Sequence, residues 1–366
     1  MKKMYLFLSV AIAGLFLFAG TNLSKNNLNG FKTGTPEIKS ISALTFGPNG
    51  ILFIGDSKSA SVFAVDTKDG ATVSKSAVVE IKGIDEKIAA ALGTQKENIK
   101  IMDMAVNPAS KKVYIAVQNS DGTPVLLKVE GAKISNVSLK EVSYSSVAIH
   151  NAPAEDSKDQ RGGSLRISSI SDIGFADGKV FVSGLSNKQF ASSFNSIPFP
   201  FTDKQDQASL EIYHASHGRY ETASPIKTFT TGEIDGKKYL IASYTCTPLV
   251  LFPLDELKSG MHVKGRTVAE MGSGNTPLDM ITIKKGNESV LVMTNTKYPV
   301  AAVNYKTIAS FQGTLTERTA TTSGVDFTKL PLTGVTQLDK LDANQVIMIQ
   351  NRGGSLDLWT ANDQTL

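Results

Sequence analysis

The chain has 366 residues, of which 20% are charged and 41% are hydrophobic, and its formal net charge is +4. This composition is that of a globular protein with ample material for a core, which excludes a disordered chain. The charge is too small to argue for nucleic acid or an anionic membrane as a partner.

Residues 1–21 are typical of a targeting segment. Lys2 and Lys3 form a positively charged start, an apolar run over residues 6–18 follows, and small residues come next. The apolar run is short for a transmembrane span, although an uncleaved N-terminal anchor is the alternative. We therefore predict a signal peptide and an exported protein of the bacterial periplasm or cell envelope, or a secreted one.

The mature chain has no predicted membrane span. Residues 22–35 are polar and rich in Gly, Asn and Lys, which predicts a flexible leader. Cys246 is the only cysteine, so no internal disulfide can stabilise the exported chain and its core must do so.

From residue 36 onward, one unit recurs: three short apolar segments separated by two polar turns. Short apolar runs broken by Gly, Asn and Pro indicate antiparallel strands, and their repetition indicates a repeat fold. Six copies span residues 41–66, 101–131, 170–195, 228–255, 278–304 and 335–363. We predict an all-β fold: one domain over residues 36–366, built as a six-bladed β-propeller with four antiparallel strands per blade.

A fourth strand is expected after five of the six units. These strands are placed at residues 77–81, 133–142, 209–214, 263–270 and 308–315. The sixth unit runs out of chain, so we predict that the N-terminal strand 36–40 completes the last blade and closes the ring. A seventh blade within residues 143–168 is the structural alternative, but that stretch has few apolar residues.

Three inserts interrupt the units. Residues 83–93 have helical apolar spacing, and residues 150–166 are polar and predict a long loop. Residues 197–201 pair prolines with phenylalanines, which favours either a docking patch for a partner or a tip that folds back on its own blade.

The units resemble NHL-repeat propellers and, more distantly, regucalcin-like and gluconolactonase-like propellers. The resemblance lies in the pattern apolar–Asp–apolar–apolar, a Gly/Asn turn, a strand, and then Asp or Asn. It implies a possible metal in the channel, held in regucalcin-like enzymes by a Glu, two Asn and an Asp, with an Asp as general base. This sequence has Ser42 where the Glu of the first blade would stand, which weighs against lactonase chemistry.

Polar residues at equivalent places in the blades are expected to gather on one face. Asp103, Asp172 and Asp279 begin inner strands, and Asn295 follows a second strand. Such residues suit a hard cation such as calcium. The alternative is that these aspartates tie turns by accepting backbone N–H groups.

A second cluster combines His214, His217 and Cys246. The repeat geometry places the loops that carry them side by side, and imidazole with thiolate suits copper or zinc. His214 and His217 can share an ion only if their strand ends between them. In the alternative, Cys246 is a small buried residue and the histidines belong to turns.

Arginines and one asparagine supply the remaining candidates for ligand binding. They are Arg161, Arg166, Arg219, Asn351 and Arg352, which could bind an anionic group or simply be solvated.

Two classes of function remain open. The first is a propeller that binds a small molecule or an envelope protein through its loop-rich channel mouth. The second is a metal-dependent enzyme, either a calcium-dependent hydrolase or a redox protein that uses His217 and Cys246. The sequence has no GxSxG, P-loop, HExxH, CxxCH or Rossmann motif.

Overall fold

The computed structural model describes residues 28–73, 76, 78–362 and 365–366. The predicted signal peptide and most of the predicted leader lie outside these residues. The end of that leader forms a short strand, β1 (Lys32–Gly34). Within the described ranges, no helix is long and apolar enough to cross a membrane.

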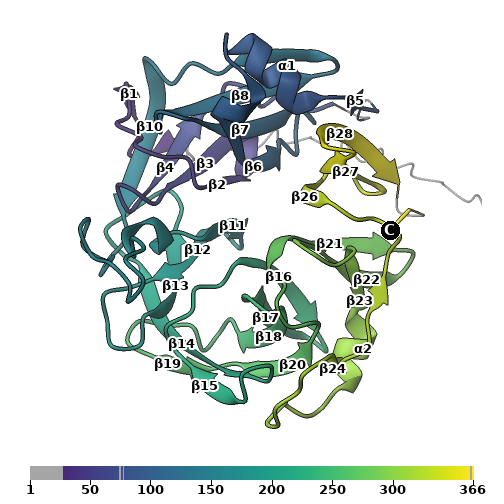
Figure 1. Ribbon diagram of the computed structural model, residues 1–366. Coiled ribbons are helices and arrows are strands. Elements are labelled where there is room, and N and C mark those ends of the chain that lie inside the picture. Colours follow the sequence, from purple (N-terminus) through teal and green to yellow (C-terminus); the bar gives the residue numbers. More distant parts are fainter. Residues whose placement is uncertain (1–27, 74–75, 77, 363–364) are drawn as a thin grey trace, which may run out of the picture.

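Six sheets surround a central axis as the blades of a propeller, which confirms the predicted fold (Figure 1). We number the blades 1 to 6 by the sequence units. In that order, the innermost strands are β2 (Ala43–Phe46), β6 (Ile99–Val106), β11 (Asp172–Ala176), β16 (Thr228–Ile234), β21 (Pro277–Lys285) and β26 (Val335–Lys340). The second strands are β3 (Ile51–Asp56), β7 (Val113–Asn119), β12 (Lys179–Leu185), β17 (Lys237–Ser243), β22 (Glu288–Asn295) and β27 (Gln345–Arg352).

The outer half of each blade holds a third and a fourth strand. The third strands are β4 (Ser61–Asp66), β8 (Pro124–Glu130), β13 (Ser192–Pro198), β18 (Pro248–Pro253), β23 (Ala301–Asn304) and β28 (Ser355–Asn362). The fourth strands are β10 (Val142–Ala148), β9 (Lys133–Asn136), β14 (Asp206–His214), β20 (Arg266–Glu270), β25 (Thr328–Lys329) and β5 (Glu80–Ile81). Short extensions are β1 on blade 1, β15 (Arg219–Glu221) and β19 (His262–Lys264) on blade 3, and β24 (Ser323–Gly324) on blade 4.

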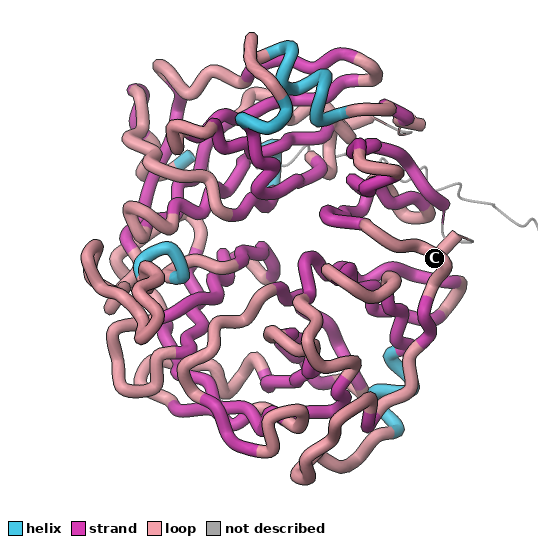
Figure 2. The backbone as a smooth tube through the Cα atoms, in the orientation of Figure 1, coloured by secondary structure: helices cyan, strands magenta, loops and turns pink. Residues whose placement is uncertain are grey.

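Among the described residues helices are few, and they lie in the connections between strands. They are α1 (Ile84–Ala91), α2 (Tyr305–Ser310) and the 3₁₀ turns Pro48–Gly50, Lys96–Asn98 and Arg166–Ser168. Helix α1 confirms the helix that the apolar spacing of residues 83–93 predicts. Figure 2 shows how much of the remaining chain is loop.

The blades do not follow one another around the ring in chain order. The inner strand of blade 2 lies between those of blades 6 and 1, and the inner strand of blade 1 lies between those of blades 2 and 3. Residues 67–141 are therefore an insertion between the third and fourth strands of blade 1. This insertion supplies β5, α1 and the whole of blade 2 before the chain returns as β10.

Six apolar clusters support this ring order, because each fills the junction between two neighbouring blades. Ile54 of blade 1 packs in one cluster with Ala116 of blade 2, and Phe53 packs in another with Val182 of blade 3. Ile115 of blade 2 shares a cluster with Ile349 of blade 6 and with helix α1. The other three clusters fill the junctions of blades 3 and 4, 4 and 5, and 5 and 6.

The ring closes through a strand from the N-terminal third, but not through the predicted one. Residues 36–40 form no strand, and the strand that completes blade 6 is β5, where Ile81 pairs with Leu358. The prediction that residues 77–81 form the fourth strand of blade 1 is wrong, because β10 takes that place. The prediction of a strand at residues 308–315 is also wrong: Asn304 caps α2 by accepting from the Lys306 N–H, and β25 takes the outer place.

Tight turns explain why the sequence units fold into hairpins. Asp177–Gly178 and Asp235–Gly236 each join a first strand to a second strand, with φ values of 51° and 71° and of 49° and 73°. Two successive positive φ values give the turn whose twist matches paired strands, and Asp-Gly adopts it readily.

Candidate functional site

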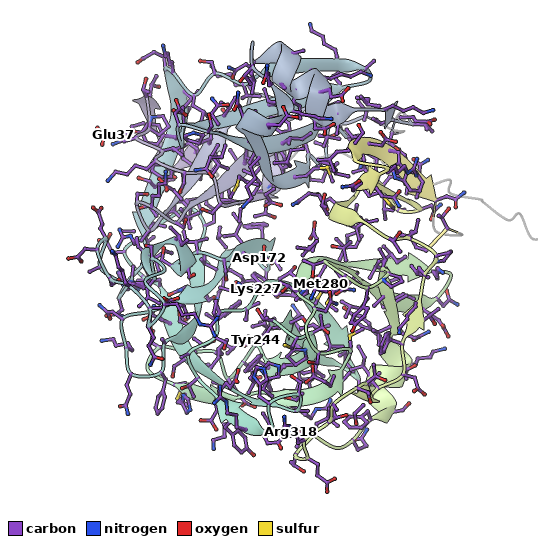
Figure 3. The ribbon with its side chains drawn as sticks, viewed as in Figure 1. Glu37, Asp172, Lys227, Tyr244, Met280 and Arg318 are labelled. Atoms are coloured by element: carbon purple, nitrogen blue, oxygen red, sulfur yellow. The ribbon has the colours of Figure 1, made fainter. Side chains whose placement is uncertain are left out.

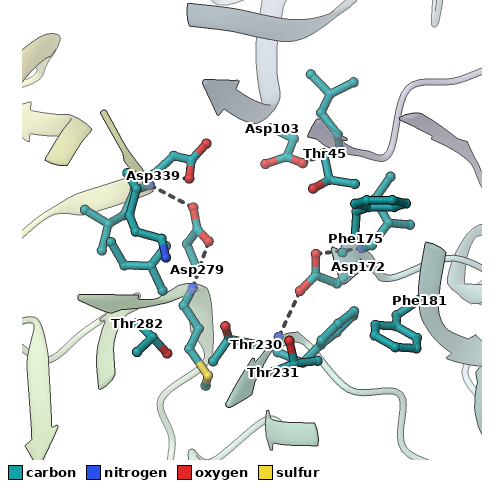
Figure 4. Close-up of a pocket in the computed structure, with 18 of the residues that line it drawn as sticks. Thr45, Asp103, Asp172, Phe175, Phe181, Thr230, Thr231, Asp279, Thr282 and Asp339 are labelled. Atoms are coloured by element: carbon teal, nitrogen blue, oxygen red, sulfur yellow. Dashed lines mark hydrogen bonds between the residues drawn. The ribbon is translucent and has the colours of Figure 1, made fainter. Parts of the chain in front are cut away.

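Four aspartates, each on an inner strand, converge on the central axis (Figure 4). Asp103, Asp172 and Asp279 were predicted to gather, and the structure brings them together with Asp339 in a cavity of about 230 Å³. Asn295 does not join them: its amide donates to the carbonyls of Met293 and Pro299.

Each of these carboxylates ties one blade to the next. One oxygen of Asp172 accepts the Ile173 N–H of its own strand at 2.8 Å, and the other accepts the Phe229 N–H of blade 4 at 2.9 Å. The same pattern recurs with Leu44 for Asp103, Leu338 for Asp279 and Val106 for Asp339. The aspartates therefore accept backbone N–H groups, as the alternative to a cation site expects. These hydrogen bonds join neighbouring blades as well as residues of one strand.

The cluster is electrostatically unfavourable when it is fully ionised. Burial raises the pKa of Asp172 to about 8, and the charge of Asp279 contributes. Burial raises the pKa of Asp339 to about 6 and those of Asp103 and Asp279 well above their usual range. Backbone N–H donors act in the opposite direction at each carboxylate.

A second cluster lies far from the axis, where blade 3 meets blade 4. Strand β14 ends at His214, and a turn carries the chain to His217, so the two imidazole rings come within 3.9 Å of each other between centroids. The condition that the strand ends between them is therefore met. Cys246 enters from the turn between β17 and β18, and its Sγ lies 3.9 Å from His217 Nε2.

One carboxylate orients both imidazoles. Glu221 accepts from His214 Nδ1 at 2.9 Å and from His217 Nδ1 at 2.7 Å. A carboxylate only accepts, so each Nδ1 carries a hydrogen, and in the neutral imidazole that a metal ion requires each Nε2 then has its lone pair free. Burial alone would raise the pKa of Glu221, but the hydrogen bonds from both histidines hold it well below its usual range.

The two lone pairs and the thiol point at the same place. His214 Nε2, His217 Nε2 and Cys246 Sγ all lie within 4.8 Å of one another. His214 is only 2% exposed, and its Nε2 has no hydrogen-bond partner among the described residues. A buried nitrogen lone pair without a partner is costly, which favours a ligand at this point.

The backbone that presents Cys246 is held in an unusual conformation. Cys246 and Thr247 both have positive φ, at 69° and 57°. Hydrogen bonds hold them there: the Cys246 N–H donates to Asn275 O at 2.7 Å, and the Thr247 hydroxyl donates to Gly272 O at 2.9 Å. Consecutive left-handed residues other than glycine are uncommon and mark positions that the surroundings must enforce.

Glu270 supports the turn that carries the histidines. It is fully buried and accepts the Ser216 N–H at 3.1 Å, and burial raises its pKa to about 7. Its second oxygen has no partner among the described residues.

The residues predicted to bind an anion do not converge. Arg166 donates to the carbonyls of Lys58 and Pro153, and Arg352 stacks on Trp359. Arg161 lies in the 150–166 loop, and Asn351 accepts the Gly354 N–H. Arg219 alone belongs to the second cluster, because its Nε donates to Glu221.

The Pro/Phe segment folds back rather than standing free. Phe199 and Phe201 pack on Phe53 of blade 1, with ring centroids 4.8 Å and 6.0 Å away. Phe175 of their own blade lies 6.3 Å from Phe199. The segment therefore contacts both its own blade and the neighbouring one.

Two residues of these clusters were missing from the predicted sites. Asp339 could have been found by aligning the Leu-Asp pair at 338–339 with that at 278–279. Glu221 lies in the same short stretch as both histidines, but its role depends on a hairpin that pairs His214 with Arg219, which spacing alone does not specify.

Comparisons with known proteins identify no family. No protein-family model and no curated protein matches the chain. A chain from the complex of Drosophila Plexin A with Semaphorin 1b is 11% identical, covers 90% of this chain and 86% of its own length, and has a TM-score of 0.38. The Cps50 (Swd1) β-propeller domain of Myceliophteria thermophila is 9% identical, with coverages of 88% and 83% and a TM-score of 0.36. Similarity of this extent carries no argument about function, and the resemblance to NHL-repeat and regucalcin-like propellers stays a prediction.

Proposed function

We propose that this protein is an exported metal-binding propeller that holds a transition-metal ion between blades 3 and 4. The ligands are His214 Nε2, His217 Nε2 and the Cys246 thiolate. The observation that carries the proposal is the buried, unpartnered lone pair of His214, which faces two further donors.

The donor set indicates the class of metal. Two imidazoles and a thiolate suit zinc or copper, whereas calcium requires six to eight oxygens. The separation of 3.9 Å between His217 Nε2 and Cys246 Sγ is close to what two ligands of one ion require, since Zn–N and Zn–S bonds are about 2.0 and 2.3 Å. Glu221 gives both histidines the outer carboxylate partner that metal-ligating histidines usually have.

The four aspartates on the central axis fit a structural role better than they fit a calcium site. Both oxygens of its carboxylates already accept backbone N–H groups from two blades. β-Propellers host many unrelated functions, including ligand and protein binding, so the fold adds no preference.

Metal content tests the proposal directly. Protein purified without a histidine tag should contain stoichiometric zinc or copper by elemental analysis, and EDTA should lower its melting temperature. Cys246→Ser and His214→Ala should lose the ion, whereas His150→Ala, which removes an exposed histidine of the 150–166 loop, should keep it. Equal metal content in Cys246→Ser and the wild-type protein would contradict the assignment.

A further inference from the structure

We infer that the ion bound by His214, His217 and Cys246 keeps one coordination position open to solvent and takes a small oxyanion there. The inference rests on the proposed function, because it concerns the fourth position of the same ion. The ligand class is a carboxylate or phosphate oxygen.

The open position follows from the number and exposure of the donors. Among the histidine, cysteine and acidic side chains that the structure describes, three groups share the common point, whereas closed structural zinc sites have four ligands. His214 closes the inner side, while His217 has 41% of its side chain exposed and Cys246 is half-buried. The side of the ion opposite His214 therefore faces solvent.

The surroundings favour a negative ligand at that position. The Arg318 stem packs over Gly218, which follows His217: a Cβ on Gly218 would lie 3.0–3.1 Å from three Arg318 side-chain carbons. The Arg318 guanidinium begins one bond beyond this contact, and the Thr319 N–H donates to Ala215 O at 2.9 Å, which docks the segment on the histidine turn. Figure 3 shows Arg318 at the rim, well away from Asp172 on the axis.

Glu221 carries a negative charge beside the site, but Arg219 is paired with it. Each Glu221 oxygen already accepts two hydrogen bonds, one from His214 and Ser224 and the other from His217 and Arg219. The charge of Arg219 is thus offset by Glu221, and Arg318, which forms no ion pair within the described residues, is the cation left for an oxyanion. Guanidinium groups suit carboxylate and phosphate oxygens.

Cobalt substitution separates the two parts of the proposal. Co²⁺ bound through Cys246 gives a thiolate charge-transfer band, and its ligand-field bands respond to the fourth ligand. The full chain loaded with Co²⁺ is titrated with inorganic phosphate and with acetate, while a weakly coordinating salt holds the ionic strength constant. We expect the ligand-field bands to change in a saturable way.

Variants then test the role of the arginine. Arg318→Gln should weaken the apparent phosphate affinity about tenfold, as expected for loss of a charge-assisted hydrogen bond. Arg161→Gln, which changes an exposed arginine of the 150–166 loop, should not change it. Arg318 is the better target because replacing Arg219 would also disturb Glu221.

The outcomes are distinguishable. Absence of the charge-transfer band would overturn the proposed function together with this inference. A charge-transfer band with ligand-field bands that no oxyanion changes would overturn the inference alone. Equal phosphate affinity in Arg318→Gln and Arg161→Gln would overturn the assignment of an oxyanion site beside Arg318.

Discussion

Replacing Asp172 by asparagine should change how the stability of the propeller depends on pH. The folded protein keeps a proton on Asp172 up to about pH 8, whereas the unfolded chain loses it near the usual value of 3.8. A group with a raised folded-state pKa contributes stability that is complete below the unfolded-state pKa and is lost as pH rises toward the folded-state pKa. The wild-type protein should therefore lose stability from about pH 4 to pH 8.

The expected magnitude follows from proton linkage. One proton held only by the folded state makes the free energy of unfolding fall by about 1.4 kcal/mol per pH unit, or about 3 kcal/mol between pH 5 and pH 7. Asp172→Asn removes this contribution to the slope, whereas Asp103, Asp279 and Asp339 keep their own. It also leaves one of the two N–H groups, of Ile173 or Phe229, without its acceptor, at a cost of about 1–3 kcal/mol at every pH. The variant should therefore be less stable at pH 5 and should approach or exceed the wild type at pH 8.

Urea unfolding at pH 5, 6, 7 and 8 measures the slope, with the fluorescence of Trp359, the only tryptophan, as the signal. Asp203→Asn, in the exposed loop between β13 and β14, is the matched control and should keep the wild-type slope. The same slope in Asp172→Asn and the wild type would refute the reasoning, because it would show Asp172 ionised throughout this range.

Three further changes test other parts of the structure. Glu221→Gln should lower zinc affinity about 10–100-fold, measured by competition with a chromophoric chelator, because the histidines lose their common acceptor; unchanged affinity would contradict this role. Ile81→Ala in β5, which is 3% exposed, should cost about 2–5 kcal/mol in urea unfolding, whereas Val78→Ala at a 71% exposed site should be neutral. Gly232→Ala should destabilise by about 1–3 kcal/mol, because its Cβ would lie 2.4 Å from the Tyr305 hydroxyl, and adding Tyr305→Phe should recover part of the loss.

The sequence predicts the blades well because each blade is local. Its first three strands lie close together in the chain, and turns such as Asp177–Gly178 determine their register without help from the rest of the molecule. Fourth strands were less predictable. Glu80–Ile81 has only two residues in β-structure, and its partner strand lies at Ser355–Asn362, so no local pattern identifies the blade that it joins.

Part of the candidate site could be predicted from the sequence, because the repeated blades fix which loops are neighbours. Residue types and repeat geometry brought His217 and Cys246 to neighbouring loops. Three features depend on contacts that spacing along the chain does not encode. They are the turn after β14 that brings His217 back beside His214, the Glu221 carboxylate that orients both rings, and the positive φ of Cys246.

The insertion of blade 2 into blade 1 constrains the order in which the chain can fold during synthesis. Residues 67–141 leave the ribosome early. However, β5 and the face of blade 2 that includes Ile115 contact Ile349 and Leu358, which are synthesised near the end of the chain. Contacts over such sequence separations form slowly and leave apolar surface exposed meanwhile. A nascent chain stopped before residue 335 would thus hold blade 2 against blade 1, but β5 and the other face of blade 2 would lack blade 6 and would leave their apolar residues exposed to a chaperone or a protease.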